Sequence, residues 1–202
     1  MAPLDTTGLR ARAREALKTS LAETAMELFD KHGYDAVTVN DIAAAAQIST
    51  RSFFRYFPNK EDVVFGGRMP TAEQARDAFV ANLDGSDIWS ALHAVIRGAA
   101  VAMEEDGVSW KRVMRVINNT VELRAKNLEK HLAWSAALYP EVANQLRAHG
   151  DTANLEARTA VSAALGCFDV ALSQWADGES SSTLPELIDR VFSFIQIRPD
   201  VA

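Results

Sequence analysis

Apolar residues recur every three or four positions along most of the chain, and strict alternation of apolar and polar residues is nearly absent. The first pattern is typical of helices with one buried face, whereas alternation would indicate strands. The first long repeat predicts a helix from about Thr7 to His32, which ends because Gly33 follows. Its buried face is formed by Leu17, Leu21, Ala25, Leu28 and Phe29. The pattern predicts an all-α protein.

Three short helices are predicted next, because three polar residues are each placed to cap a helix start. Thr38 and Asp41 have the spacing of a capping box, in which each side chain can bond to the other residue's amide. Ser49 repeats the spacing with Ser52, and Asn59 is the third cap. The predicted helices cover about 39–46, 50–57 and 59–68. Two short helices behind a long one form a three-helix unit that contains a helix-turn-helix.

The remainder of the chain is divided by glycine, proline and an asparagine pair into pieces of helix length. These pieces are predicted near 71–83, 87–105, 108–117, 120–138, 140–149, 152–177 and 184–197. Pro140 is interpreted as the break between the fourth and fifth pieces. We therefore predict two domains, a helix-turn-helix domain over 1–68 and a helical domain over 69–202.

The stretch ISTRSFFRYFPNK, residues 48–60, carries four aromatic and three basic residues. A helix this short buries only one face, so the aromatic residues must divide between core and surface. Phe53 and Phe57 lie four residues apart and are predicted to point inward. Their predicted core partners are Phe29, Ile42 and Ile48. The outward face then holds Thr50, Arg51, Phe54 and Arg55.

This outward face has the chemistry that DNA recognition requires. A helix in the major groove reads base edges with its N-terminal residues, where arginine pairs with guanine and threonine contacts the thymine methyl group. Thr50 and Arg51 occupy that first turn. Hydroxyl groups, basic groups and helix N-terminal amides bind the flanking phosphates. The predicted DNA-binding residues are Thr38, Ser49, Thr50, Arg51, Ser52, Arg55, Tyr56 and Lys60.

One segment of the chain resembles a known family. The run from Thr24 to Val64, TAMELFDKHGYDAVTVNDIAAAAQISTRSFFRYFPNKEDVV, strongly resembles the DNA-binding domain of the TetR family of bacterial transcriptional regulators. The family frame is matched by Leu28–Phe29, Gly33–Tyr34, Thr38, Ile42–Ala43, Ser49, Phe53, Tyr56–Phe57 and Lys60. The resemblance implies a double-stranded DNA operator, a homodimer, and a C-terminal domain for ligand binding and dimerisation.

Three positions depart from the family frame. Gln47 lies in the turn between the two short helices, where relatives usually carry Gly, so it must tolerate or avoid a positive φ angle. Phe54 lies where the family often has a Tyr that touches a phosphate, and a phenyl ring cannot donate a hydrogen bond. Arg51 precedes Ser52 at a place where a small residue is common, so it adds either base readout or a phosphate contact.

The net charge of −6 argues at first sight against a nucleic-acid partner. The acidic excess belongs to residues 69–202, however, because residues 1–68 hold nine basic and nine acidic side chains. A basic face is still available in the neutral part from Arg10, Arg12, Arg14, Lys18, Arg51, Arg55 and Lys60. The four N-terminal members are interpreted either as a solvated arm or as a DNA contact.

The last two predicted helices carry broad apolar stripes, which the resemblance assigns to a four-helix dimer interface. A symmetric dimer would set two recognition helices about one turn of DNA apart, roughly 34–36 Å. The same stripes could instead be the internal core of one chain. The candidate interface residues are Val161, Leu165, Phe168, Leu172, Leu187, Val191, Phe194 and Ile195.

The helices in between carry aromatic and methionine side chains that suit an adaptable apolar cavity. The candidate ligand contacts, each of which could instead belong to the core, are Trp89, Met103, Trp110, Met114, Ile117, Leu128, His131 and Trp134. Basic residues among them would suit an acidic head group. The segment from Trp110 to Trp134 also resembles actinobacterial TetR regulators of the mycofactocin-cluster type, which implies a fatty acyl-CoA ligand.

Other functional classes receive little support from the sequence. Hydrolase, metalloprotease and phosphate-loop motifs are absent and the four histidines are dispersed, so we predict no enzyme, no cofactor and no metal site. No apolar run is long enough to span a bilayer, and the N-terminus lacks the apolar core of a secretory signal. We therefore expect a cytoplasmic protein without a membrane partner.

The sequence favours a homodimeric repressor that a small apolar or acyl-type molecule releases from its operator, with the helix over 59–68 linking reader to sensor. The alternative is a small-molecule carrier or dimeric interaction module with a vestigial helix-turn-helix. Gln47 and Phe54 keep that alternative open.

Overall fold

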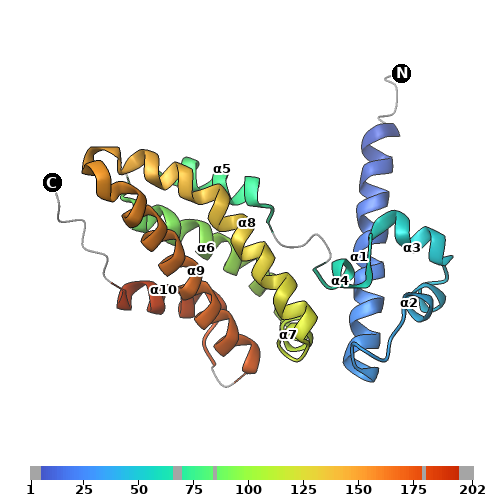
Figure 1. The fold of residues 1–202 in the computed structure, drawn as a ribbon. Helices are drawn as coiled ribbons and strands as arrows, with labels where there is room; N and C mark the ends of the chain where they lie inside the picture. Colours follow the sequence, from blue (N-terminus) through green and yellow to red (C-terminus); the bar gives the residue numbers. More distant parts are fainter. Residues whose placement is uncertain (1–5, 66–69, 84–85, 179–180, 196–202) are drawn as a thin grey trace. The chain divides into compact units, whose positions relative to one another are not determined.

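The computed structural model describes residues 6–65, 70–83, 86–178 and 181–195, and the regular elements in these ranges are helices (Figure 1). They are α1 (Thr6–His32), α2 (Val39–Ala45), α3 (Thr50–Tyr56), α4 (Lys60–Phe65), α5 (Ala72–Asn82), α6 (Ile88–Glu105), α7 (Gly107–Asn118), α8 (Val121–Gln145), the 3₁₀ helix η1 (Arg147–Thr152), α9 (Ala153–Asp177) and α10 (Leu184–Phe194). The all-α prediction is confirmed. The helices form two compact units, an N-terminal unit with α1–α4 and a C-terminal unit.

The helix starts of the N-terminal unit are fixed by caps. The Thr38 amide donates to Asp41 Oδ2 over 2.8 Å, and the Asp41 amide donates to Thr38 Oγ1 over 3.3 Å, which completes the capping box of α2. The Ser52 amide donates to Ser49 Oγ over 3.0 Å at the start of α3. Each cap satisfies an amide that its helix leaves without a backbone partner. The predicted starts of α2 and α3 are therefore confirmed.

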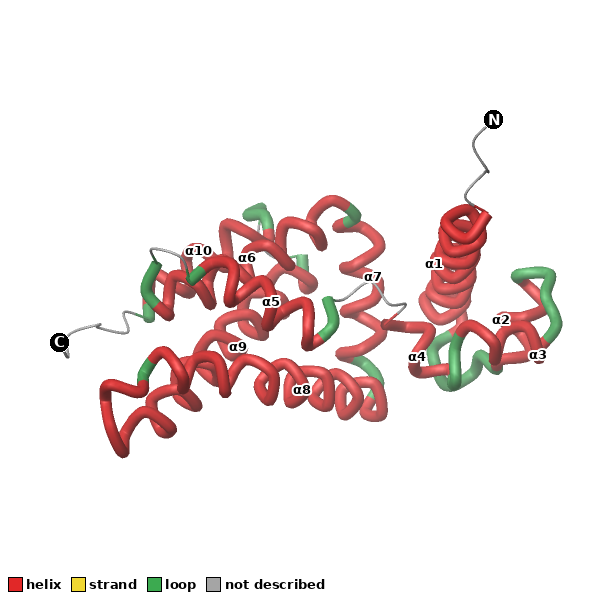
Figure 2. The backbone as a smooth tube through the Cα atoms, turned by 90° about the horizontal axis from the view of Figure 1, so that it is seen from above, coloured by secondary structure: helices red, strands yellow, loops and turns green. Residues whose placement is uncertain are grey.

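Aromatic side chains form the core of the N-terminal unit. Phe53 and Phe57 are buried from α3, and their ring centroids lie 5.9 Å apart. Phe29 from α1 and Ile42 from α2 are buried too, whereas Ile48 in the turn is only half-buried. In both views α2 and α3 lie on the same side of the long helix α1 (Figures 1 and 2). This core presents the opposite face of α3 to solvent.

The segment Val116–Leu123, where α7 ends and α8 begins, belongs to the N-terminal unit. The Thr120 and Leu123 side chains within it are buried. α4 ends at Phe65, and its predicted continuation over 66–68 lies outside the described residues. The division of function between residues 1–68 and 69–202 stays a prediction.

The C-terminal unit is a set of packed helices around α6 and α9. α10 packs against both of them, and α5 packs against α6. α8 and α9 run side by side (Figures 1 and 2). The buried positions Leu92, Ile96 and Ala100 recur every four residues along α6, which turns one helix face into core. Within the described ranges, no helix combines the length and the apolar character needed to cross a membrane.

The predicted helix break at Pro140 is wrong, because α8 continues through this residue to Gln145. A proline inside a helix removes one backbone hydrogen bond and costs about 3 kcal/mol. Leu138 and Val142 flank the proline, and both side chains are almost completely buried. Burying a large aliphatic side chain contributes about 1.5–3 kcal/mol. Two such anchors offset the cost of the proline, so packing overrides the local signal.

Candidate nucleic-acid interface and ligand cavity

The solvent face of α3 carries the residues that the sequence predicts to read DNA. Arg51 and Arg55 are exposed, and Phe54 is 51% exposed between them. Thr50 is half-buried, and its hydroxyl donates to Asn40 Oδ1 of α2 over 2.9 Å. Sequence reasoning missed Asn40, because no motif distinguishes a polar residue in the first turn of α2. The bond fixes Thr50 and Asn40 as one polar unit across the two helices.

The turn between α2 and α3, which orients the solvent face of α3, contains a residue with a strained backbone. Gln47 adopts φ 55°, so it tolerates the positive φ angle and does not avoid it, and it is the one non-glycine residue with positive φ in the described part of the chain. The left-handed conformation costs a non-glycine residue roughly 1–2 kcal/mol. Two hydrogen bonds hold the turn. The Gln47 amide donates to the Ala44 carbonyl over 3.1 Å, and the Ile48 amide donates to the Ala43 carbonyl over 2.9 Å. These two bonds help to offset the strain.

The hydroxyl groups predicted to bind phosphates lie at the helix starts and are already engaged within the unit. Thr38 Oγ1 donates to Asp41 Oδ2 over 2.6 Å, and Ser49 Oγ lies 2.9 Å from Ser52 Oγ. The hydrogen bonds from Thr38 lower the pKa of the exposed Asp41 carboxyl. Each hydroxyl oxygen keeps the capacity for a further bond. These residues therefore combine helix capping with a place on the exposed face.

Lys60 lies at the start of α4 and points into the N-terminal unit. Its Nζ donates to the Tyr34 carbonyl over 2.9 Å and to the Val37 carbonyl over 3.1 Å. The ammonium also lies 3.8 Å from the centroid of the Tyr34 ring. Burial and the negative charge of Glu61 raise the pKa of Tyr34. Lys60 thus ties α4 to the loop between α1 and α2, and its predicted phosphate contact stays a prediction.

A cavity of about 230 Å³ opens in the C-terminal unit between the start of α5, the middle of α8 and α9. Its walls are Pro70, Thr71, Ala72, Lys130, His131, Ala133, Trp134 and Phe168. Trp134 donates its indole N–H to the Pro70 carbonyl over 3.1 Å, and its ring stacks on Phe168 at an interplanar angle of 8°. His131 Nδ1 lies 3.3 Å from Asp169 Oδ1. The cavity therefore has aromatic walls and basic residues within the same lining.

Two of the eight predicted ligand contacts, His131 and Trp134, line this cavity. Four others, none of which is among the residues that line it, are buried side chains: Met103, Trp110, Met114 and Ile117. Trp89 is half-buried and donates its indole N–H to the Phe192 carbonyl over 3.4 Å, whereas Leu128 is 60% exposed. Phe168 lines the cavity although its periodicity had placed it with the dimer stripe.

The predicted dimer stripe is largely core within the single chain. Buried side chains of this stripe are Val161, Leu165, Phe168, Leu172 and Leu187, while Val191 and Ile195 are half-buried. Phe194, in contrast, is 89% exposed at the end of α10, and Val170 of α9 is 60% exposed. A broad apolar stripe can face α6 of its own chain as well as a second copy. The homodimer stays a prediction.

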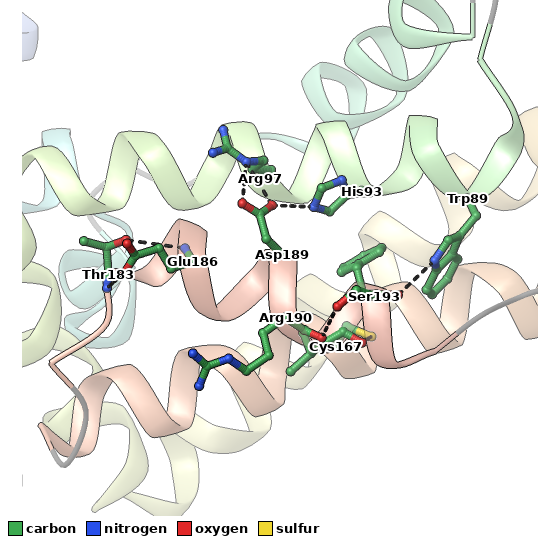
Figure 3. A network of polar contacts seen from close by, with 11 residues as sticks. Trp89, His93, Arg97, Cys167, Thr183, Glu186, Asp189, Arg190 and Ser193 are labelled. Atoms are coloured by element: carbon green, nitrogen blue, oxygen red, sulfur yellow. Dashed lines mark hydrogen bonds and ion pairs between the residues drawn. The ribbon is translucent and has the colours of Figure 1, made fainter.

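A polar network joins α6 to α10 in the C-terminal unit (Figure 3). Asp189 Oδ1 lies 2.7 Å from His93 Nε2 and accepts from Arg97 Nε over 2.9 Å. No local pattern predicts this network, because Asp189 lies more than ninety residues from both His93 and Arg97. His93 and His131 pair with different aspartates, and the described residues contain no cluster able to hold a metal ion.

Two family models match separate segments of the chain. Residues 21–65 match the family described as bacterial regulatory proteins, tetR family, and residues 86–198 match the MftR C-terminal domain. A protein of Mycobacterium tuberculosis assigned as mycofactocin biosynthesis transcriptional regulator MftR is 30% identical over 188 residues, 91% of each chain. The HTH-type transcriptional regulator TcmR of Streptomyces glaucescens is 29% identical over 133 residues, 61% of this chain and 57% of its own.

Solved structures share the fold at low sequence identity. The repressor NalD of Pseudomonas aeruginosa superposes with a TM-score of 0.59 and 20% identity, covering 89% of this chain and 96% of NalD. The regulator FadR of Bacillus subtilis, solved with stearoyl-CoA, gives a TM-score of 0.57 and 18% identity over 86% of this chain and 95% of its own. Identities this low support the helical fold alone.

Proposed function

Because the chain belongs to the TetR family of bacterial transcriptional regulators, and its relatives are regulators and not enzymes, we propose a ligand-responsive homodimeric repressor that acts on DNA in the cytoplasm. The DNA-binding part follows from the family. The ligand response rests on one observation, the aromatic cavity with His131 and Lys130 in its lining. The small-molecule carrier with a vestigial helix-turn-helix is the alternative.

The exposed turn of α3 supports sequence reading. Thr50 and Arg51 lie at the N-terminal end of the helix, where a recognition helix meets base edges. Arg51 is exposed and can pair with guanine through two hydrogen bonds, which discriminates against other bases by about 1–3 kcal/mol. Phe54 cannot bond to a phosphate, but apolar contact with a thymine methyl group is open to it. The face therefore retains the chemistry of a reader despite its departures from the family frame.

The size of the cavity restricts the ligand. Cavities that enclose a drug-sized molecule typically measure about 300–1,000 Å³, and this one measures about 230 Å³. A compact apolar group with an acidic end fits the aromatic walls and the basic residues. The stearoyl-CoA complex of FadR motivates an acyl-type ligand. If the ligand is an acyl-CoA, its nucleotide part must lie outside this cavity.

A homodimer would explain how a short reading helix reaches useful affinity. Two copies related by a twofold axis present two recognition helices to half-sites about 34–36 Å apart. Apolar side chains available for such contact are Val170 and Phe194, which are exposed on α9 and α10. The ligand must bind the DNA-bound and the released conformations with different affinity, because equal affinity shifts nothing.

Decanoate and decanol have alkyl chains of the same length, but only decanoate carries a negative charge. Comparing them separates the contribution of the alkyl chain to ligand binding from that of the charge. We expect decanoate to bind more tightly than decanol in isothermal titration calorimetry, because Lys130 and His131 lie in the cavity lining. Ala133 is exposed at the cavity rim, and the substitution Ala133→Phe should fill the space and weaken both ligands at least tenfold. Leu128→Phe, on an exposed position of the same helix, is the matched control.

The same ligands decide between regulator and carrier. Under the proposal, decanoate releases the protein from operator DNA in a fluorescence-anisotropy assay, and Ala133→Phe abolishes the release. A carrier would bind decanoate with the same loss in Ala133→Phe, yet would show no sequence-specific DNA binding. Binding of decanoate that Ala133→Phe leaves unchanged would contradict the assignment of this cavity.

A further inference from the structure

A shallow groove of about 410 Å³ lies in the N-terminal unit between α1 and the end of α3. Its lining consists of Ala13, Arg14 and Leu17 from α1 and Arg55 and Tyr56 from α3. None of these lining residues is acidic, and both arginines are exposed. The groove is separate from the first turn of α3, which is assigned to base edges above. Arg55 and Tyr56 are among the predicted DNA-binding residues, but no ligand has yet been assigned to the groove that they form with α1.

We infer that this groove binds a backbone phosphate of double-stranded DNA, with Arg14 and Arg55 as its cationic ligands. The inference rests on the proposed DNA-binding function and adds Arg14, a residue of α1, to the interface. Guanidinium groups bind phosphate oxygens through paired, charge-assisted hydrogen bonds. Two of them, on opposite sides of one groove, more than neutralise the single negative charge of a phosphodiester and leave sequence readout to the start of α3.

The position of Tyr56 adds a third polar contact. Its hydroxyl accepts from Arg55 Nη2 over 3.4 Å, and the guanidinium carbon lies 5.2 Å from the centroid of its ring. The phenol thereby restrains Arg55 and keeps its own proton to donate to a phosphate oxygen. Phe54 offers no such donor, so the second half of α3 depends on Arg55 and Tyr56 for polar contact with DNA.

Lys18 extends the positive charge of the groove along α1. It follows Arg14 by four residues and therefore lies on the same face of the helix. Its ammonium lies 5.7 Å from the centroid of the Phe57 ring, a side chain of the core. The cationic face of the groove is thus anchored to the packing that also positions α3. This coupling favours a preorganised contact over a mobile, solvated arm.

The test compares Arg14→Gln with Lys31→Gln. Each substitution removes one positive charge from an exposed position of α1, but the two positions lie seventeen residues apart, about 25 Å along the helix. Each neutralised phosphate contributes about 0.9 to the magnitude of the slope of log K against log salt concentration. Between 1 M and 0.1 M salt, one phosphate contact therefore adds about eightfold to the binding constant, and a variant that loses the contact loses this gain. Arg14→Gln should show this loss on operator and scrambled DNA alike, and its salt slope should fall by about one.

A double-variant cycle tests whether the arginines share one phosphate. If they do, Arg14→Gln combined with Arg55→Gln loses less affinity than the product of the single losses, because either change alone already disrupts the clamp. Equal thermal unfolding of wild type and Arg14→Gln, followed by circular dichroism, would verify that the fold is intact. Binding by Arg14→Gln equal to that of Lys31→Gln would overturn the inference while leaving the proposed function standing. If the wild type binds operator and scrambled DNA equally, and Arg14→Gln weakens this binding, the groove assignment holds and the proposal of a sequence-specific regulator fails.

Discussion

Both units begin helices with local caps, and the C-terminal unit adds contacts that join much more distant parts of the chain. In the N-terminal unit, three caps join residues three positions apart, at Thr38, Ser49 and Asn59. In the C-terminal unit, side-chain contacts between α6 and α10 join residues more than ninety positions apart, as between Asp189 and His93 (Figure 3). Trp134 likewise reaches the Pro70 carbonyl across 64 positions.

Under the proposed function, the N-terminal unit must keep its shape on DNA, and the C-terminal unit must change when a ligand binds. Local caps preorganise α2 and α3, so the reading face needs no ligand to form. Long-range contacts between half-exposed charges hold α6 against α10 with modest strength. Around the cavity, one indole hydrogen bond joins α8 to the start of α5. We expect ligands to rearrange these contacts without unfolding any helix.

The largest expected effect concerns the aromatic core of the reading unit. Phe53→Ala removes a completely buried ring and should lower the free energy of unfolding by about 3–5 kcal/mol. Operator binding should be lost with it. Phe54→Ala is the matched control, because that neighbouring ring is 51% exposed and its loss should change stability by less than about 0.5 kcal/mol. Urea denaturation of both variants measures the difference, and similar losses would contradict the assignment of inner and outer faces.

The next effect concerns the long-range network. Asp189→Asn should destabilise the protein by about 1 kcal/mol, because it weakens the contacts with His93 and with Arg97 at once. The loss stays modest because solvent screens both contacts. Asp77→Asn breaks an exposed contact with the adjacent Arg76 and should cost no more than a few tenths of a kcal/mol. Equal thermal shifts for the two variants would mean that the network does not hold α10 in place.

A smaller and opposite effect is expected in the turn before α3. Gln47→Gly relieves the strain of φ 55° in the folded state but raises the conformational entropy of the unfolded state. The free energy of unfolding should therefore rise by about 0.5 kcal/mol. Ala46→Gly, at φ −80°, relieves no strain and should lower stability by about 0.4–1 kcal/mol. Chemical denaturation measures both signs. A loss for Gln47→Gly as large as that for Ala46→Gly would contradict the strain at this turn.

The smallest effect compares capping aspartates of the two units as a function of pH. Bonds from Thr38 lower the pKa of Asp41 below the ordinary 3.8, and the Ser90 amide lowers that of Asp87 at the start of α6. Ionised carboxyls therefore stabilise the folded chain above about pH 3.8, and this contribution is lost as the pH falls through the lower folded values. Asp41→Asn and Asp87→Asn should each flatten the acid side of the melting-temperature profile. Unchanged profiles would show that these caps do not favour the charged form.

Features that depend on contacts between residues close in sequence could be predicted, whereas features that depend on distant residues could not. The caps and the aromatic spacing of α3 are local signals, so the bounds of α2 and α3 and the inward positions of Phe53 and Phe57 were predicted correctly. Pro140 misled because the buried neighbours that carry α8 across it are a tertiary effect. Phe168 could not be placed, since periodicity shows that a residue is buried and not whether it faces a cavity, a core or a second chain.

The most direct test of the account is an anisotropy titration of the purified protein against duplex DNA from the region flanking its own gene, with scrambled DNA as control at the same salt concentration. We expect two protomers, or a multiple, to bind each site, with an affinity at least about 10³-fold above that for scrambled DNA. Arg51→Ala should reduce that ratio, because Arg51 is assigned to base edges. Equal, weak binding of wild type to both DNAs would contradict the account and favour the carrier.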